Sequence, residues 1–198
     1  MRHAPYAFPR SKDPSLRAVC AICISLVSSL PSAHAESPES RQRPAEIRPP
    51  FALTWGETSD RLERMVALAG GKVVNRRMAR GNREAIEVEN IAQEGLHRTI
   101  FYFKLGALVG AELIYRGESW TEDQFNEKMS VLRRLISKTY GEGEPIVRST
   151  EKVGSVGVTQ TVTGYRWSAG ASYMMLVYFA ATDGNHAFRT ISVHYNAN

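Results

Sequence analysis

Cysteine is almost absent from the chain, and its two cysteines, Cys20 and Cys23, lie close together near the N-terminus. Both fall within an apolar run over about 18–30, which follows basic residues and precedes a small-x-small triplet at 33–35. This pattern predicts an export signal over residues 1–35. A chain cleaved there has no thiol, which excludes a disulfide framework and a cysteine nucleophile.

The chain also has little net charge. The formal net charge is +5, and most of the excess lies within residues 1–35. The chain from Glu36 onward would be nearly neutral, so it lacks the basic surface that nucleic-acid binding needs. The apolar run is too short to span a bilayer, which counts against the alternative of an uncleaved anchor. We therefore expect a periplasmic or secreted protein that binds no nucleic acid and has no transmembrane segment after processing.

The composition that remains is typical of a globular domain. Hydrophobic residues make up 43% and charged residues 23% of the chain, which excludes disorder, collagen and coiled coil for the chain as a whole. Residues 36–50 are the exception, because they hold four prolines and only two apolar residues. We predict a disordered tether over 36–50 and a single domain over 51–198.

Two helices are expected within this domain. The first follows a short predicted strand at 51–55, begins near Asp60 and ends at a glycine pair. The second begins with the capping box of Thr121 and Gln124 and ends at Gly141, where a residue of left-handed backbone conformation is wanted.

The remaining runs alternate between apolar and polar residues and are separated by Gly, Asn and Asp, which predicts strands joined by hairpins. They cover about 72–78, 83–91, 97–104, 108–116, 145–153, 158–167, 171–180 and 187–196. The predicted fold class is α+β, with a mostly antiparallel sheet backed by two helices. The order of elements also fits two strand-helix-sheet repeats, over 51–107 and 108–198, although chance likeness explains such short stretches equally well.

Three short pieces carry a resemblance to known proteins. They are the Leu-Thr-Trp-Gly run at 53–56, the hairpin at 101–109 and the helix end at 140–145. The pattern resembles small secreted bacterial helix-plus-sheet repeat proteins of the β-lactamase-inhibitor-like and SmpA/OmlA outer-membrane-assembly types. The resemblance implies a fold that serves protein binding. It transfers no functional residues, because none of the binding motifs of those families can be matched.

Catalytic motifs are missing from the chain after residue 35. It contains no G-x-S-x-G, H-E-x-x-H or C-x-x-C. Its histidines, His97, His186 and His194, are far apart in sequence, and a hydrogen-bonded structural role is the simplest interpretation of His194. We expect no enzyme activity, no cofactor and no metal.

Two carboxylates offer an alternative. Glu87 and Glu89 share one face of a predicted strand and, with His194, could form a hard-metal or an acid-base site. However, Ile86 and Val88 alternate with them, so the period of two already predicts that both glutamates face water.

The apolar pattern gives the strongest functional indication. The strand at 171–180 is apolar or aromatic on both faces, and the strand at 97–104 is similar. If helices cover one face, Tyr102, Tyr173, Met175 and Val177 are left on the other, and their composition is typical of a protein-binding surface. The alternative is that the sheet curls or dimerises, or that the tether covers it, so that both faces are buried.

Four arginines cluster around one predicted turn. Arg76, Arg77 and Arg80 are a candidate electrostatic rim for the binding surface, together with nearby Arg83. They could contact the phosphates of an anionic lipid surface. The glutamates on the return strand could instead pair with them across the hairpin.

These observations favour an exported, non-enzymatic protein-interaction module of the bacterial cell envelope, whose partner is an envelope protein or a second copy of the chain. The alternatives are a small envelope enzyme or a ligand or lipid carrier, with a cavity between helices and sheet, and a binder of anionic lipid surfaces.

Overall fold

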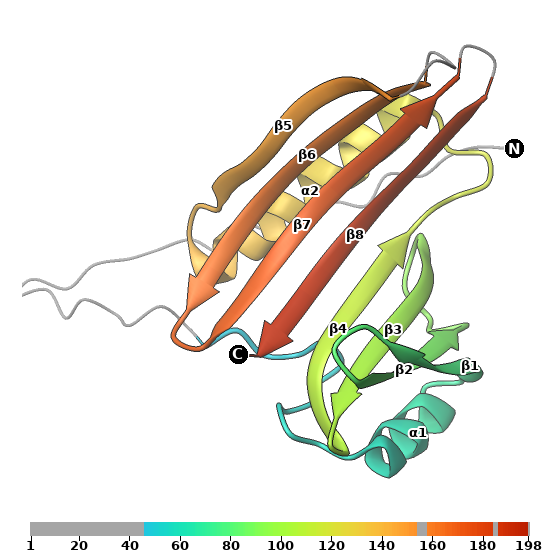
Figure 1. Ribbon diagram of the computed structural model, residues 1–198, viewed down its shortest axis with the longest axis vertical. Coiled ribbons are helices and arrows are strands. Elements are labelled where there is room, and N and C mark those ends of the chain that lie inside the picture. The colour runs from blue at the N-terminus through green and yellow to red at the C-terminus, as the bar shows by residue number, and fades with distance from the viewer. Residues whose placement is uncertain (1–45, 154–157, 184–185, 198) are drawn as a thin grey trace, which may run out of the picture. The chain divides into compact units, whose positions relative to one another are not determined.

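The computed structural model describes residues 46–153, 158–183 and 186–197. The predicted export segment at 1–35 and most of the predicted tether at 36–50 lie outside this part. Within it the chain forms two helices and eight strands (Figure 1), which confirms the predicted α+β class. In chain order they are α1 (Ser59–Leu68), β1 (Lys72–Ala79), β2 (Arg83–Glu89), β3 (Leu96–Lys104), β4 (Ala107–Tyr115), α2 (Glu122–Tyr140), β5 (Glu144–Val153), β6 (Val158–Ala169), β7 (Ser172–Thr182) and β8 (Ala187–Ala197).

The strands form one antiparallel sheet in the order β1-β2-β3-β4-β8-β7-β6-β5. Each helix is followed by four strands, which lie in chain order from an edge of the sheet to its centre. The last strands of the two sets, β4 and β8, pair with each other at the centre. The predicted repeat units, 51–107 and 108–198, are not confirmed. The strand that was expected to open the second unit is β4, which closes the first set of strands.

The segment before α1 differs from the prediction. Residues 51–55 contain no strand. Phe51 and Ala52 form a turn instead, with positive φ angles of 61° and 55°. Residues 46–50 are not a free tether either, since Ile47 is fully buried. The Trp55 indole Nε1 donates a hydrogen bond of 2.9 Å to the Ile47 carbonyl and so ties the end of the predicted tether to the domain.

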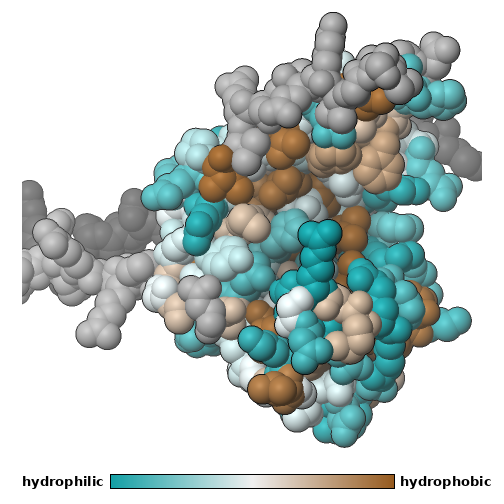
Figure 2. All heavy atoms as spheres, in the orientation of Figure 1, coloured by the Kyte–Doolittle hydropathy of each residue, from teal (hydrophilic) through white to brown (hydrophobic). Residues whose placement is uncertain are grey.

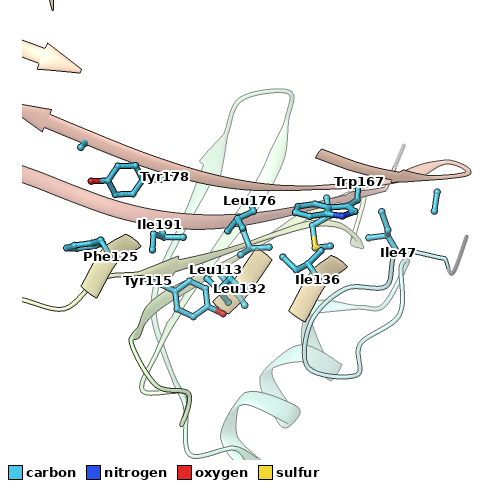
Figure 3. Close-up of a cluster of buried hydrophobic side chains, with 14 residues drawn as sticks. Ile47, Leu113, Tyr115, Phe125, Leu132, Ile136, Trp167, Leu176, Tyr178 and Ile191 are labelled. Atoms are coloured by element: carbon cyan, nitrogen blue, oxygen red, sulfur yellow. The ribbon is translucent and has the colours of Figure 1, made fainter. Parts of the chain in front are cut away.

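A core of fourteen buried side chains lies between α2 and the strands β4, β6, β7 and β8 (Figure 3). The buried residues of α2 are Phe125, Leu132 and Ile136, which form a single stripe because they are seven and four residues apart. The Trp167 Nε1 donates to the carbonyl of Gly141 at 2.8 Å and anchors the end of α2 to β6.

The ends of α2 follow the prediction. The Gln124 amide donates to the Thr121 hydroxyl, and the Gln124 side chain accepts from the Thr121 amide, so the capping box is formed. Gly141 has a φ of 81° at the C-terminal end. For α1 the prediction was wrong by two residues, because the N-cap is Thr58 rather than Asp60, and the Thr58 side chain makes no capping hydrogen bond.

A second core lies between α1 and the strands β2, β3 and β4. On β4, Ala111 belongs to this core, whereas Leu113 and Tyr115 belong to the α2 core. These positions differ by two residues, so they point to the same face of the sheet, and both helices therefore cover that face. The opposite face carries neither helix, and we call it the open face. No helix of the described residues is long and apolar enough to cross a membrane.

Candidate functional site: the open face of the sheet

The strand register places the predicted contact residues on the open face. Tyr102 on β3 pairs with Gly110 on β4, Gly110 pairs with Asn196 on β8, and Asn196 pairs with Tyr173 on β7. The two tyrosines therefore lie in one row across four strands. Met175 and Val177 follow Tyr173 on the same face of β7, because side chains repeat every two residues.

Apolar side chains run along β7 on this face. Tyr173, Met175, Val177 and Phe179 are half-buried, whereas the residues between them are buried under α2. This alternation matches the prediction. We call these four residues the apolar strip.

Two more exposed apolar residues flank the apolar strip. Phe188, which is 48% exposed, lies with its ring centroid 6.1 Å from that of Phe179. On the other side, Ile146 is 37% exposed and covers Gly164, where a Cβ atom would lie 2.9 Å from the Ile146 Cγ1. Figure 2 shows hydrophobic residues gathered over β5–β8, while hydrophilic residues predominate over β1–β4.

A row of polar side chains borders the apolar strip across the centre of the sheet. The Tyr102 hydroxyl donates to Glu112 Oε2 at 3.0 Å. Glu112 Oε1 lies 3.9 Å from His194 Nε2, which is hydrogen-bonded to the Ser192 hydroxyl at 2.8 Å. His194 is thus a half-buried, hydrogen-bonded histidine. We call these four residues the polar row.

The geometry of the polar row differs from that of a serine triad. In a serine triad the hydroxyl and the carboxylate contact different nitrogens of the imidazole. Here Ser192 and Glu112 both approach Nε2 of His194. The pKa of Tyr102 is raised to about 12, first by burial and then by the charge of Glu112 and the hydrogen bond to it. Its hydroxyl therefore keeps its proton and remains a donor at neutral pH.

Cation–π contacts hold both tyrosines of the row that crosses the sheet. The guanidinium of Arg83 lies 4.8 Å from the ring centroid of Tyr102. The guanidinium of Arg166 lies 4.7 Å from the ring centroid of Tyr173. Each contact places a guanidinium group over an aromatic ring of the open face.

Glu87 contradicts the prediction that it faces water, because it is only 5% exposed. Its Oε1 accepts from Arg77 Nε at 2.9 Å, and its Oε2 accepts from Arg98 Nη1 at 2.9 Å. Glu89 is half-buried and accepts from Arg98 Nη2 at 2.6 Å. The prediction that Ile86 and Val88 face the core is confirmed, because both are fully buried on the helix face. The other face is covered locally by arginine side chains from β1 and β3.

These contacts set the ionisation of Glu87. Burial alone would raise the pKa of the carboxyl. The hydrogen bond from Arg77 and the positive charges of Arg98 and Arg77 outweigh that effect and, with Asn75, lower the pKa below its ordinary value. Glu87 is therefore an ion-paired carboxylate and not a raised-pKa general acid.

The arginines of the predicted rim do not lie on one surface. Arg77 lies on the open face, whereas its neighbour Arg76 points to the helix face and pairs with Glu63 of α1 and with Glu84. Arg80 is exposed at the hairpin turn, where its carbonyl accepts from Arg83 Nε at 3.1 Å. Arg76 therefore cannot border the same surface as Tyr102.

The described residues contain no group of three or more His, Cys, Asp or Glu side chains that could hold a metal ion. Comparison with known proteins found no matching family model, no matching curated protein and no matching solved structure. Glu112 and Ser192 were not predicted as members of a site. Their period-two positions could have assigned them to the open face, but the β4–β8 pairing that joins Glu112 to His194 spans most of the domain.

Proposed function

We propose that the chain is an exported, non-enzymatic protein-interaction module of the bacterial cell envelope, and that its partner binds the open face across the apolar strip. One observation carries this proposal: Tyr173, Met175, Val177 and Phe179 are only half-buried on a sheet face that no described helix covers. Tyrosine and methionine are enriched in protein interfaces, and contiguous exposed apolar surface on a small protein is typical of a binding site.

The polar groups beside the apolar strip support the same function. Tyr102, Glu112, His194 and Ser192 bond to one another, and Arg98 is held by two glutamates. Polar side chains that are already fixed lose little conformational entropy when a partner binds. The surface is thus an apolar strip with an ordered polar border, which is the arrangement of a protein interface with an apolar centre and a polar rim.

The alternatives have less support. A lipid-surface binder needs several free cationic groups close together. Of the four hairpin arginines, Arg76 and Arg77 are each paired with glutamate and Arg83 lies over the Tyr102 ring, which leaves only Arg80 exposed at the turn among the described contacts. An enzyme that uses Glu87, Glu89 or His194 needs a group poised to give or take a proton, but Glu87 is ion-paired and its pKa is lowered.

Site-specific photocrosslinking in cells tests the proposal. A photoreactive amino acid is placed at Met175 on the open face, and in a matched strain at Leu135, which is exposed on α2. We expect a discrete protein adduct from position 175 and no such adduct from position 135. The adduct should disappear when Tyr173→Ala is added to the Met175 probe.

Sedimentation of the purified chain distinguishes a partner from a second copy of the chain. An adduct of twice the chain mass, together with a dimer that Tyr173→Ala dissociates, would identify the partner as the chain itself. Equal adducts from positions 175 and 135, or an adduct that persists with Tyr173→Ala, would contradict binding through the apolar strip.

A further inference from the structure

An apolar cavity lies on the helix-covered side of the sheet, between α1 and β3. Its volume is about 130 Å³, and its lining includes Phe51, Leu53, Leu62, Met65, Val66 and Phe101. Leu53, Leu62 and Phe101 are almost fully buried, whereas Phe51 and Met65 are half-buried. The cavity therefore extends inward from the edge of α1 to the second core.

The size and lining of this cavity define what it can hold. An apolar cavity of about 150 Å³ in a protein core stays dry and takes up benzene or xenon. The cavity here is of similar size but opens at the edge of α1, where Phe51 and Met65 are half-buried, and every side chain that lines it is apolar. Water has no polar partner in such a place, and a charged group would lose its hydration there without compensation. The fitting occupant is an uncharged apolar group about as large as one aromatic ring.

One wall of the cavity is a strained turn. Phe51 and Ala52 are consecutive non-glycine residues with positive φ, which is rare because Cβ crowds the backbone in that region. The turn places the Phe51 ring 6.2 Å from the Phe101 ring, centroid to centroid, at the cavity. Strained backbone persists only where neighbouring structure holds it, and it gathers at ligand-binding segments.

Contacts on both sides of the turn hold it in place. The Trp55 side chain bonds to the Ile47 carbonyl at 2.9 Å before the turn. After it, the Gly56 amide donates to the Leu108 carbonyl at 3.0 Å, and the Leu108 amide donates to the Glu57 carbonyl at 2.8 Å. The cavity wall is therefore attached to the sheet rather than free to collapse into the space.

We propose that this cavity is a binding site for an uncharged apolar ligand, either a single-ring molecule or the end of an alkyl chain. The site is independent of the proposed protein-binding function, because the cavity lies on the opposite side of the sheet from the apolar strip. Failure of either proposal therefore leaves the other intact.

Thermal unfolding of the full chain with benzene and with n-octanol tests the proposal and separates the two ligand shapes. A ligand at ten times its Kd should raise Tm by about 3–6 °C for a domain of this size. A shift with benzene alone would assign a ring site, and a larger shift with octanol would assign an alkyl-chain site. NMR contacts from the ligand should reach the methyl groups of Leu62 and Val66 but not those of Leu176 in the α2 core.

Two substitutions on α1 provide a matched comparison. Leu62→Phe adds volume at the cavity, where Leu62 is 2% exposed, and Leu68→Phe adds the same volume at a position that is 89% exposed. We expect the ligand-induced shift to disappear in L62F and to persist in L68F. If L62F does not fold, Val66→Ile adds one methyl group to the cavity wall and should raise the ligand Kd at least threefold.

The proposal is overturned if neither ligand shifts Tm of the unmodified chain, if folded L62F or V66I binds as well as L68F, or if the NMR contacts fall on Leu176.

Discussion

Replacing Glu87 by Gln should destabilise the fold at neutral pH, although the two side chains have nearly the same shape. Glu87 is 5% exposed and accepts charge-assisted hydrogen bonds from Arg77 and Arg98, both at 2.9 Å. The amide of Gln removes the negative charge that holds both guanidinium groups and turns an acceptor atom into a donor that faces one of them.

The magnitude follows from the burial of the partners. A hydrogen bond to a charged group contributes about 1.5–3 kcal/mol. The Arg77 and Arg98 side chains are partly exposed, so solvent screens them and they can rehydrate after the substitution. We therefore expect Glu87→Gln to lower the free energy of unfolding by about 2 kcal/mol, below the cost of breaking a fully buried ion pair.

Glu84 supplies the matched control. It lies on the same strand but is more exposed, and its contact with Arg76 is longer, at 3.3 Å. Glu84→Gln should therefore change the free energy of unfolding by less than about 0.5 kcal/mol. Denaturant unfolding of both variants and of the unmodified chain at pH 7 measures the difference.

The pH dependence of stability shows whether the effect of Glu87→Gln comes from the lost charge or from a change in side-chain packing. The pKa of Glu87 is lowered in the folded state, so its stabilising effect is complete above the unfolded value of about 4.3 and is lost as pH falls through the lower folded value. The gap between the unmodified chain and Glu87→Gln should therefore close as the pH is lowered below about 4. A gap that is the same at pH 7 and pH 3, or no gap at pH 7, would refute the ion-pair account.

Five further substitutions test the local structure by denaturant unfolding. Ala52→Gly relieves a positive φ of 55° and should stabilise the fold by about 0.5–1 kcal/mol, whereas Ala67→Gly in α1 should destabilise it by a similar amount; a loss of stability in both would contradict the strain at Ala52. Thr121→Ala removes a formed capping box and should cost about 1 kcal/mol, whereas Thr58→Ala removes no capping bond and should cost much less. Leu176→Ala empties a fully buried position and should cost about 2–5 kcal/mol, so a loss below 1 kcal/mol would show that the α2 core is not packed as described.

Features fixed by near neighbours in the chain could be predicted from the sequence. The capping box of Thr121 needs only Gln124, three residues away, and the alternation along β7 needs only the strand itself. Both are local consequences of backbone geometry, so the order of polar and apolar residues reports them directly. The apolar strip was found in this way.

Features that depend on neighbouring strands were not predicted. Alternation placed Glu87 on the correct face of β2 but could not reveal that Arg77 and Arg98 cover it from β1 and β3. The turn at Phe51 and Ala52 was mistaken for a strand because its composition is typical of strands while its φ angles are not. In each case the surrounding fold overrides the local preference.

The sheet order also has a consequence for how the chain folds. Among the described strands, every neighbouring pair is a hairpin except β4 and β8, which are separated along the chain by α2 and three strands. Closing that long loop has the highest entropic cost of any pairing in the sheet, so we expect the central seam to form last. During synthesis β4 emerges well before β8. Until the last strand arrives, β4 is an unpaired edge strand, and we expect this edge to be a site of aggregation during folding.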